Sequence, residues 1–254
     1  MKKIILIISI FLLISNFSKA QNNFTVVILN GEIKNKTSNK ALHIGEEINK
    51  NMSFQFSQRN NYALLINKKN KERAILRKKP NDDIYFAKSN FTTAMSNMSS
   101  RSGLCFKNSV DFATYFADTI AIINNTEIIF DTEKYPIDST HFFFISYIDK
   151  NNKAVLKKLK SKNDTLFINY NDFNYTNKTN NIDSKILYRK NDTSYFLSKM
   201  NVNIINSENL KETYKVLKGM YNKDELPQEL NNIICFQYGK CQEEDILNFI
   251  EENK

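Results

Sequence analysis

The chain has 254 residues, of which 41% are hydrophobic and 25% charged, and its formal net charge is +9. These proportions are close to the average of globular proteins, so they exclude an intrinsically disordered chain and allow a buried core in one large domain or two smaller ones. Because only 5 residues are glycine, a glycine-rich loop that binds phosphate or a dinucleotide is not expected.

Residues 1–20 have the pattern of a secretory signal peptide. Lys2 and Lys3 precede an apolar stretch at 4–14, and the small residues Ser18 and Ala20 stand three and one positions before the expected cut. The stretch is shorter than the roughly 20 residues of a membrane-spanning helix, and a retained N-terminal anchor is the alternative interpretation. We expect an exported protein, periplasmic or extracellular, that does not span the membrane after cleavage.

Residues 21–79 predict a small β-barrel or sandwich. The β-branched, apolar run at 24–29 stops at Asn30-Gly31, which is a strong tight-turn pair. A hairpin is expected around the polar turn at 67–70. The expected strands are 24–29, 42–48, 52–56, 62–66 and 74–76.

The order of elements in this region resembles the periplasmic FecR-like β-domain. A strand, Gly31, the run Leu-His-Ile-Gly-Glu-Glu-Ile at 42–48, an alternating strand and a hairpin follow one another. Similar small β-modules form the N-terminal part of many secreted proteins of Bacteroidota. The resemblance implies an interaction module and no chemistry. The cytoplasmic segment and membrane helix of a FecR-type regulator are not expected in this chain, so a regulatory role is not implied.

Residues 80–117 predict a linker with a short helix. Pro80–Asp83 marks the expected boundary of the β-domain, and the stretch at 89–102 is rich in Ser, Thr, Asn and Met. Ser109 is a candidate cap for the short helix, with Phe112 and Phe116 on its apolar side.

Residues 118–254 predict a second domain, an antiparallel β-meander followed by helices. The pair of strands at 119–123 and 126–130 is expected to form a hairpin about Asn124-Asn125, because two polar residues separate them. All connections are too short for parallel crossovers. The other expected strands are 141–148, 153–159, 165–170, 185–189 and 195–200.

The last fifty residues change to a helical period. We expect one helix after Ser207, a second that starts at Asp224 and ends at Gly239, and a third with the acids at 243–245 in its first turn. Helices that follow a meander define an α+β fold.

Two basic clusters carry much of the positive charge. For an exported protein, an anionic envelope polymer or a lipid head group is a better partner for them than nucleic acid, and neither cluster has the interleaved aromatic residues of a nucleic-acid groove. The alternative is a solvated lysine face on edge strands, which prevents edge-to-edge pairing. The first cluster is Lys68, Lys69, Lys71, Arg73, Arg77, Lys78 and Lys79; the second is Lys150, Lys153, Lys157, Lys158, Lys160 and Lys162.

Catalytic and metal-binding patterns are weak. The two histidines, His43 and His141, lie about a hundred residues apart without a local ligand spacing, so no metal site is expected. Acids are adjacent at 46–47, 82–83 and 243–245, and two dispersed carboxylates are the one basis for an enzyme. We expect no enzyme activity and no cofactor.

The three cysteines allow a disulfide in an oxidising compartment. Cys235 and Cys241 flank the expected helix end at Gly239, so a disulfide between them would join two helices. Cys105 would then be buried or bonded to a partner. A catalytic pair of Cys105 and His141 is the alternative.

The expectation is therefore an exported, soluble, non-catalytic envelope protein that acts by binding another envelope protein or a surface. The alternatives are an envelope hydrolase with dispersed carboxylates and a binder of an anionic envelope polymer. No nucleic-acid partner is expected.

Overall fold

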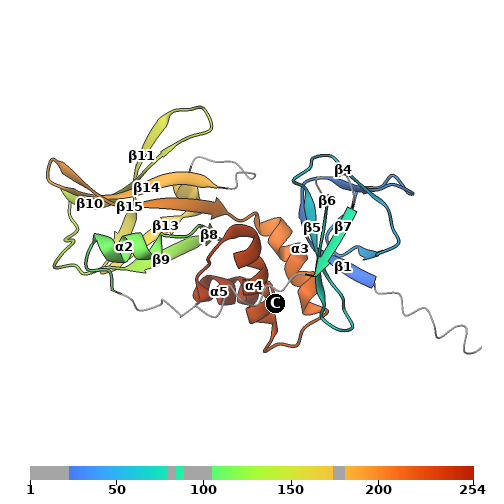
Figure 1. Ribbon diagram of the computed structural model, residues 1–254. Helices are drawn as coiled ribbons and strands as arrows, with labels where there is room; N and C mark the ends of the chain where they lie inside the picture. Colours follow the sequence, from blue (N-terminus) through green and yellow to red (C-terminus); the bar gives the residue numbers. More distant parts are fainter. Residues whose placement is uncertain (1–22, 79–83, 89–104, 174–180) are drawn as a thin grey trace, which may run out of the picture. The chain divides into compact units, whose positions relative to one another are not determined.

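The computed structural model describes residues 23–78, 84–88, 105–173 and 181–254 (Figure 1). The chain consists of two compact units, with the division after Asn90. The predicted signal peptide, Lys79, the acids at 82–83 and most of the expected linker lie outside the described residues. Within the described ranges, no helix has the length and apolar character needed to cross a membrane.

The first unit is the small β-domain that we predicted. An antiparallel sheet has the strand order β3-β1-β5-β6-β7, and β2 pairs with β4. Buried side chains from β1, β5 and β6 pack with Ile33, Leu42 and Phe54 in one core. The strands are β1 (Asn23–Asn30), β2 (Ile33–Asn35), β3 (Glu47–Asn49), β4 (Phe54–Phe56), β5 (Tyr62–Ile66), β6 (Arg73–Lys78) and β7 (Ile84–Lys88).

Two details of this unit differ from the expectation. The segment at 42–48 is mostly a turn, because Gly45 has a φ of 89° and its N–H donates to the carbonyl of Val26; only the end of the segment joins β3. Strand β7 pairs with β6, so the unit continues beyond residue 79, where we expected it to end.

The second unit contains two sheets and C-terminal helices, which confirms the α+β class. Its sheets have the orders β11-β10-β14-β15-β8 and β12-β13-β9. Its elements are α2 (Ser109–Tyr115), β8 (Ile120–Ile122), β9 (Asn125–Ile129), β10 (His141–Ile148), β11 (Ala154–Lys158), β12 (Lys160–Lys162), β13 (Thr165–Asn169), the 3-10 helix η2 (Tyr170–Asp172), β14 (Ile182–Lys190), β15 (Thr193–Ile204), α3 (Ser207–Lys218), α4 (Leu226–Tyr238) and α5 (Glu243–Glu252).

An aromatic core fills this unit, and helix α2 belongs to it. Phe112 of α2 and Phe143 of β10 are fully buried in the same cluster, with their ring centroids 5.7 Å apart. The helix is therefore part of the second unit and not of a linker. Its cap is Asn108 rather than Ser109, because the Asn108 Oδ1 accepts from the N–H groups of Val110 and Asp111.

The expected hairpin about Asn124-Asn125 is wrong. β8 pairs in parallel with β15, and β9 pairs antiparallel with β13 in the other sheet. A two-residue spacing allows a hairpin but does not require one, and here the Asn124 carbonyl accepts from the N–H of Tyr170 beside η2. Strands β8 and β9 consequently belong to different sheets, and β8 pairs with β15 in parallel.

The C-terminal helices form where the period predicts them, with small shifts at their starts. Asn206, one residue before the expected cap, holds the start of α3 through the N–H groups of Glu208 and Asn209. Helix α4 begins at Leu226 with a proline in its first turn, where the missing N–H has no cost. Gly239 ends it at a φ of 106°.

Candidate anionic-surface binding face

The larger sheet of the second unit has one face in the core and one directed to solvent. Side chains alternate between the two faces of a strand. Phe143, Ile145 and Tyr147 of β10 are buried in the aromatic core, so Phe142 and Phe144 belong to the opposite side. We call that side, on strands β10, β11, β14 and β15, the outer face.

Strand register brings basic and apolar side chains together on the outer face. Phe144 lies opposite Lys158 of β11 and Leu187 of β14, and Leu187 lies opposite Phe196 of β15. The next row contains Ser146 with Leu156, Lys185 and Lys199, and the row on the other side contains Phe142 with Arg189 and Ser194. Basic and apolar side chains are therefore mixed on the outer face of these four strands, which Figure 1 labels β11, β10, β14 and β15.

The outer face combines exposed apolar area with positive charge. Leu156 is 71% exposed and Phe196 is 54% exposed. The Nζ of Lys158 lies 4.2 Å from the centroid of the Phe142 ring, a cation–π contact that keeps the ammonium on this side of the sheet. The β14–β15 register also places the acidic Asp183 on the outer face. The basic residues Lys158, Lys185, Arg189 and Lys199 outnumber it.

The second basic cluster of the sequence is only partly on the outer face. Lys158 lies on it, whereas Lys157 lies opposite the core residue Ile145 and belongs to the other side of β11. Lys160 and Lys162 lie in β12 of the smaller sheet. Since β11 is an edge strand, its lysines also protect that edge from pairing with another chain.

The first basic cluster does not form a single face. Lys68 and Lys69 lie in the β5–β6 turn, and Lys68 Nζ is 2.6 Å from Glu47 Oε1. Along β6, the exposed Arg77 alternates with the buried Leu76, so Lys78 falls on the side of the core residues. Its other described members are Lys71 and Arg73, and Lys79 lies outside the described residues.

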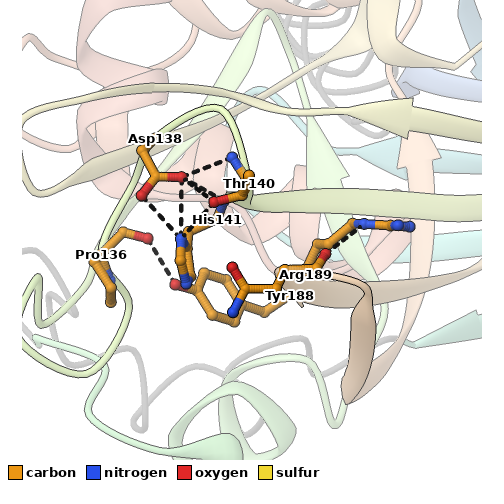
Figure 2. A network of polar contacts seen from close by, with 7 residues as sticks. Pro136, Asp138, Thr140, His141, Tyr188 and Arg189 are labelled. Carbon is orange, nitrogen blue, oxygen red and sulfur yellow. Dashed lines mark hydrogen bonds and ion pairs between the residues drawn. The ribbon is translucent and has the colours of Figure 1, made fainter.

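His141 lies in a polar network that holds a turn. Figure 2 shows its Nδ1 directed at the Asp138 carboxylate, 2.8 Å from Oδ2. Asp138 also accepts from the N–H and hydroxyl of Thr140, and these hydrogen bonds lower the pKa of Asp138 to about 2. Tyr188 donates to the Pro136 carbonyl at 2.6 Å, so both ends of the segment at 136–141 are fixed. This arrangement indicates a structural role.

The other two candidates for a metal or catalytic site, His43 and Cys105, lie in different units. His43 is exposed and pairs with Glu46 beside the Gly45 turn, and Cys105 is exposed at the start of the described second unit. Among the described residues, no group of three or more His, Cys, Asp or Glu side chains is arranged to hold a metal ion.

A small polar pocket contains a carboxyl whose pKa is strongly raised. It has a volume of about 200 Å³ and lies between the turn at 123–125 and helix α5, where Asp245, Asn248, Glu251 and Glu252 line it. Burial, and then repulsion from Glu127 and Glu244, raises the pKa of Asp245 to about 7. A carboxyl with this pKa can exchange a proton near neutral pH.

Replacing Asp245 with asparagine should make the second unit more stable at high pH. The folded-state pKa of about 7 lies above the ordinary value of 3.8, so folding is penalised once pH rises through this window and not below it. We expect Asp245→Asn to raise the free energy of unfolding by about 2–3 kcal/mol at about pH 8 and to change it little at about pH 4.

Urea unfolding of the variant and the parent at both pH values would measure this effect. Glu243→Gln is the matched control, since Glu243 is an exposed acid in the same helical turn. An equal pH dependence in the parent and in Asp245→Asn would contradict the buried, protonated state of Asp245.

Cys235 and Cys241, the predicted disulfide pair, are free thiols in the structure. Cys235 is in the last turn of α4, and Cys241 is buried just before α5. The backbone N–H of Cys241 lies close enough to the Cys235 sulfur to lower the pKa of that thiol, although burial raises this pKa by more. The disulfide between them stays a prediction.

Comparison of the chain with protein-family models, curated proteins and solved structures gives no match. The site therefore has to be interpreted from its own chemistry. Sequence reasoning missed Lys185, Arg189, Phe196 and Lys199 as members of one surface. The alternation of charged with buried residues along β14 is the signal that was present, but the strand order that brings the residues together is not visible in the sequence.

Proposed function

We propose that this is an exported protein that binds an anionic lipid surface of the cell envelope through the outer face. The observation that carries the proposal is the mixture of lysines with exposed apolar side chains on one face of the sheet. The signal-peptide pattern at 1–20 supports the location, because an exported protein meets lipid head groups rather than nucleic acid. The resemblance to FecR-like β-domains supports an interaction role for the first unit.

The mixture of side chains favours a lipid surface over a polar polymer. Each lysine near an anionic membrane contributes about 1 kcal/mol to binding. Leu156 and Phe196 are exposed on the same face, and burying each at the boundary between head groups and acyl chains adds about 1.5–3 kcal/mol. A hydrated polysaccharide or polyphosphate would use the charges but would leave the aliphatic Leu156 in water.

Vesicle co-sedimentation of the full chain tests the proposal. The probes are vesicles of phosphatidylcholine and phosphatidylglycerol in equal parts, and vesicles of phosphatidylcholine alone. We expect binding to the anionic vesicles, weakened by salt because the charges are at the surface. Replacing Lys158, Lys185 and Lys199 together with glutamine should weaken it about 100-fold, since three contributions of about 1 kcal/mol are lost.

A charge-matched control separates the outer face from the rest of the basic surface. The variant Lys68→Gln, Lys69→Gln, Arg77→Gln removes the same charge from exposed positions of the first unit, and it should bind the anionic vesicles within about threefold of the parent. An equal loss in both triple variants would contradict a specific role of the outer face.

A second pair of substitutions distinguishes a lipid surface from an anionic polymer. Leu156→Ser with Phe196→Ser should weaken vesicle binding and leave retention on dextran sulfate unchanged. If these variants bind vesicles as the parent does, or if the parent binds only dextran sulfate, the partner is a polymer and the lipid proposal fails.

A second candidate function is hydrolysis by dispersed carboxylates, and the pocket beside α5 is the observation that favours it. Asp245 and Glu251 line the same pocket, and their environments move their pKa values in opposite directions: burial raises that of Asp245, and a hydrogen bond from Lys254 lowers that of Glu251. Such a pair matches a general acid and an ionised base. Release of nitrophenol from a panel of nitrophenyl glycosides tests it, and activity unaffected by Asp245→Asn would exclude this pair.

A further inference from the structure

The junction between α4 and α5 brings two cysteines together by backbone geometry. Gly239 ends α4 with its N–H on the Cys235 carbonyl, and Lys240 then forms a parallel bridge to Ile120 of β8. This path returns the chain towards the last turn of α4. Cys241 consequently lies with its backbone N–H close enough to the Cys235 sulfur to influence the pKa of that thiol.

The Cys235 sulfur and the Cys241 backbone are neighbours in the structure. A disulfide needs Cα atoms within about 4.4–6.8 Å of each other, and this proximity brings the two residues together for such a bond. Cys241 is only 6% exposed and Cys235 is half-buried, so the pair is covered by the helices and is shielded from large oxidants once the unit has folded.

The same burial controls when the bond can form. The folded environment keeps both groups as thiols, because burial raises the pKa of each and the neighbouring Asp245 raises that of Cys241 further. Thiolate is the reactive form in disulfide exchange. Oxidation is therefore expected before α5 packs, and reduction of the finished bond is expected to be slow.

We propose that Cys235 and Cys241 form an intramolecular disulfide that joins the end of α4 to the start of α5. The oxidant is a small-molecule or protein disulfide. One cysteine thiolate attacks it, forms a mixed disulfide and releases one oxidant thiol. The second cysteine thiolate attacks the protein sulfur of that mixed disulfide and releases the other thiol. Two protein thiols lose two electrons, one oxidant disulfide is reduced to two thiols, and the two protons end on those thiols.

Refolding the full chain with oxidised glutathione tests the proposal. The product should be lighter than the reduced chain by two hydrogen atoms, and peptide mapping should find Cys235 linked to Cys241. A reductant should lower the Tm of the second unit by about 5–9 °C, the effect of releasing a short loop in a unit of this size.

Two serine variants complete the experiment. Cys105→Ser should keep both the mass loss and the reductant-dependent shift in Tm, because Cys105 has no part in the bond. Cys235→Ser should lose both, whatever its own stability, because the comparison is between its oxidised and reduced samples. Full alkylation of Cys235 and Cys241 after denaturation of the oxidised chain, or a crosslink to Cys105, would overturn the proposal.

Discussion

Replacing Phe143 with alanine is expected to lower the free energy of unfolding of the second unit by about 3–5 kcal/mol. Phe143 is fully buried, and its ring centroid lies between 5.0 and 5.7 Å from those of Phe112, Phe130, Tyr135 and Tyr188. Its loss would remove buried area, leave a cavity and break four ring contacts, of which the one with Phe130 is edge-to-face and the other three are tilted. Urea unfolding followed by circular dichroism would measure the effect.

Phe196→Ala is the matched control for this substitution. It removes the same side chain from the same sheet, but from the outer face, where Phe196 is 54% exposed. The control should cost at most about 1 kcal/mol. Equal costs for the two variants would show that the two sides of the sheet are not the buried and exposed faces described above.

Replacing Gly239 with alanine is expected to lower the free energy of unfolding by about 3–4 kcal/mol. Gly239 has a φ of 106° and a ψ of −170°, a region that essentially only glycine adopts. A Cβ at this position would also overlap the backbone carbonyl of Thr119. That carbonyl accepts from the N–H of Lys240, and the Lys240 carbonyl in turn accepts from Ala121, so relief of the overlap would disturb both hydrogen bonds.

Gly219→Ala separates this effect from the simple loss of a glycine. Gly219 has a φ of −78°, and the nearest atom to an added Cβ is the Val216 carbonyl oxygen at 3.5 Å, an ordinary contact. This control should be neutral or stabilising by up to about 1 kcal/mol. Thermal unfolding of both variants gives the comparison, and a neutral Gly239→Ala would refute the close approach of the α4 end to β8.

Local features of the fold could be predicted from the sequence where adjacent residues determine them. The turn at 67–70 predicts the β5–β6 hairpin, and the structure confirms it, with Asn67 Oδ1 accepting from the N–H groups of Lys69 and Asn70. The strand pairs β10–β11 and β14–β15 are confirmed for the same reason. The three C-terminal helices follow from a period of apolar residues that the core buries.

Features that depend on distant partners could not be predicted. Asn124-Asn125 has the spacing of a hairpin, but β8 pairs with β15 and β9 pairs with β13 in a different sheet. The outer face also depends on residues that are distant from one another in the sequence. Lys158, Lys185 and Lys199 come from three strands, and only the register places them beside Phe144 and Phe196. The raised pKa of Asp245 also required the packing of α5, because its cause is burial.

The parallel pairing of β8 has a consequence for the order in which the second unit folds. β8 pairs with the end of β15 and forms another bridge with Lys240. Both partners lie far along the chain from β8. Closing such long loops costs conformational entropy before the contacts that offset this cost have formed. Topologies with many non-local pairs therefore fold slowly. We expect the β10–β11 and β14–β15 hairpins to form early and the β8 side to close last, after residues near 240 have been synthesised. The second unit would then stay open on its β8 side until most of the chain has been synthesised.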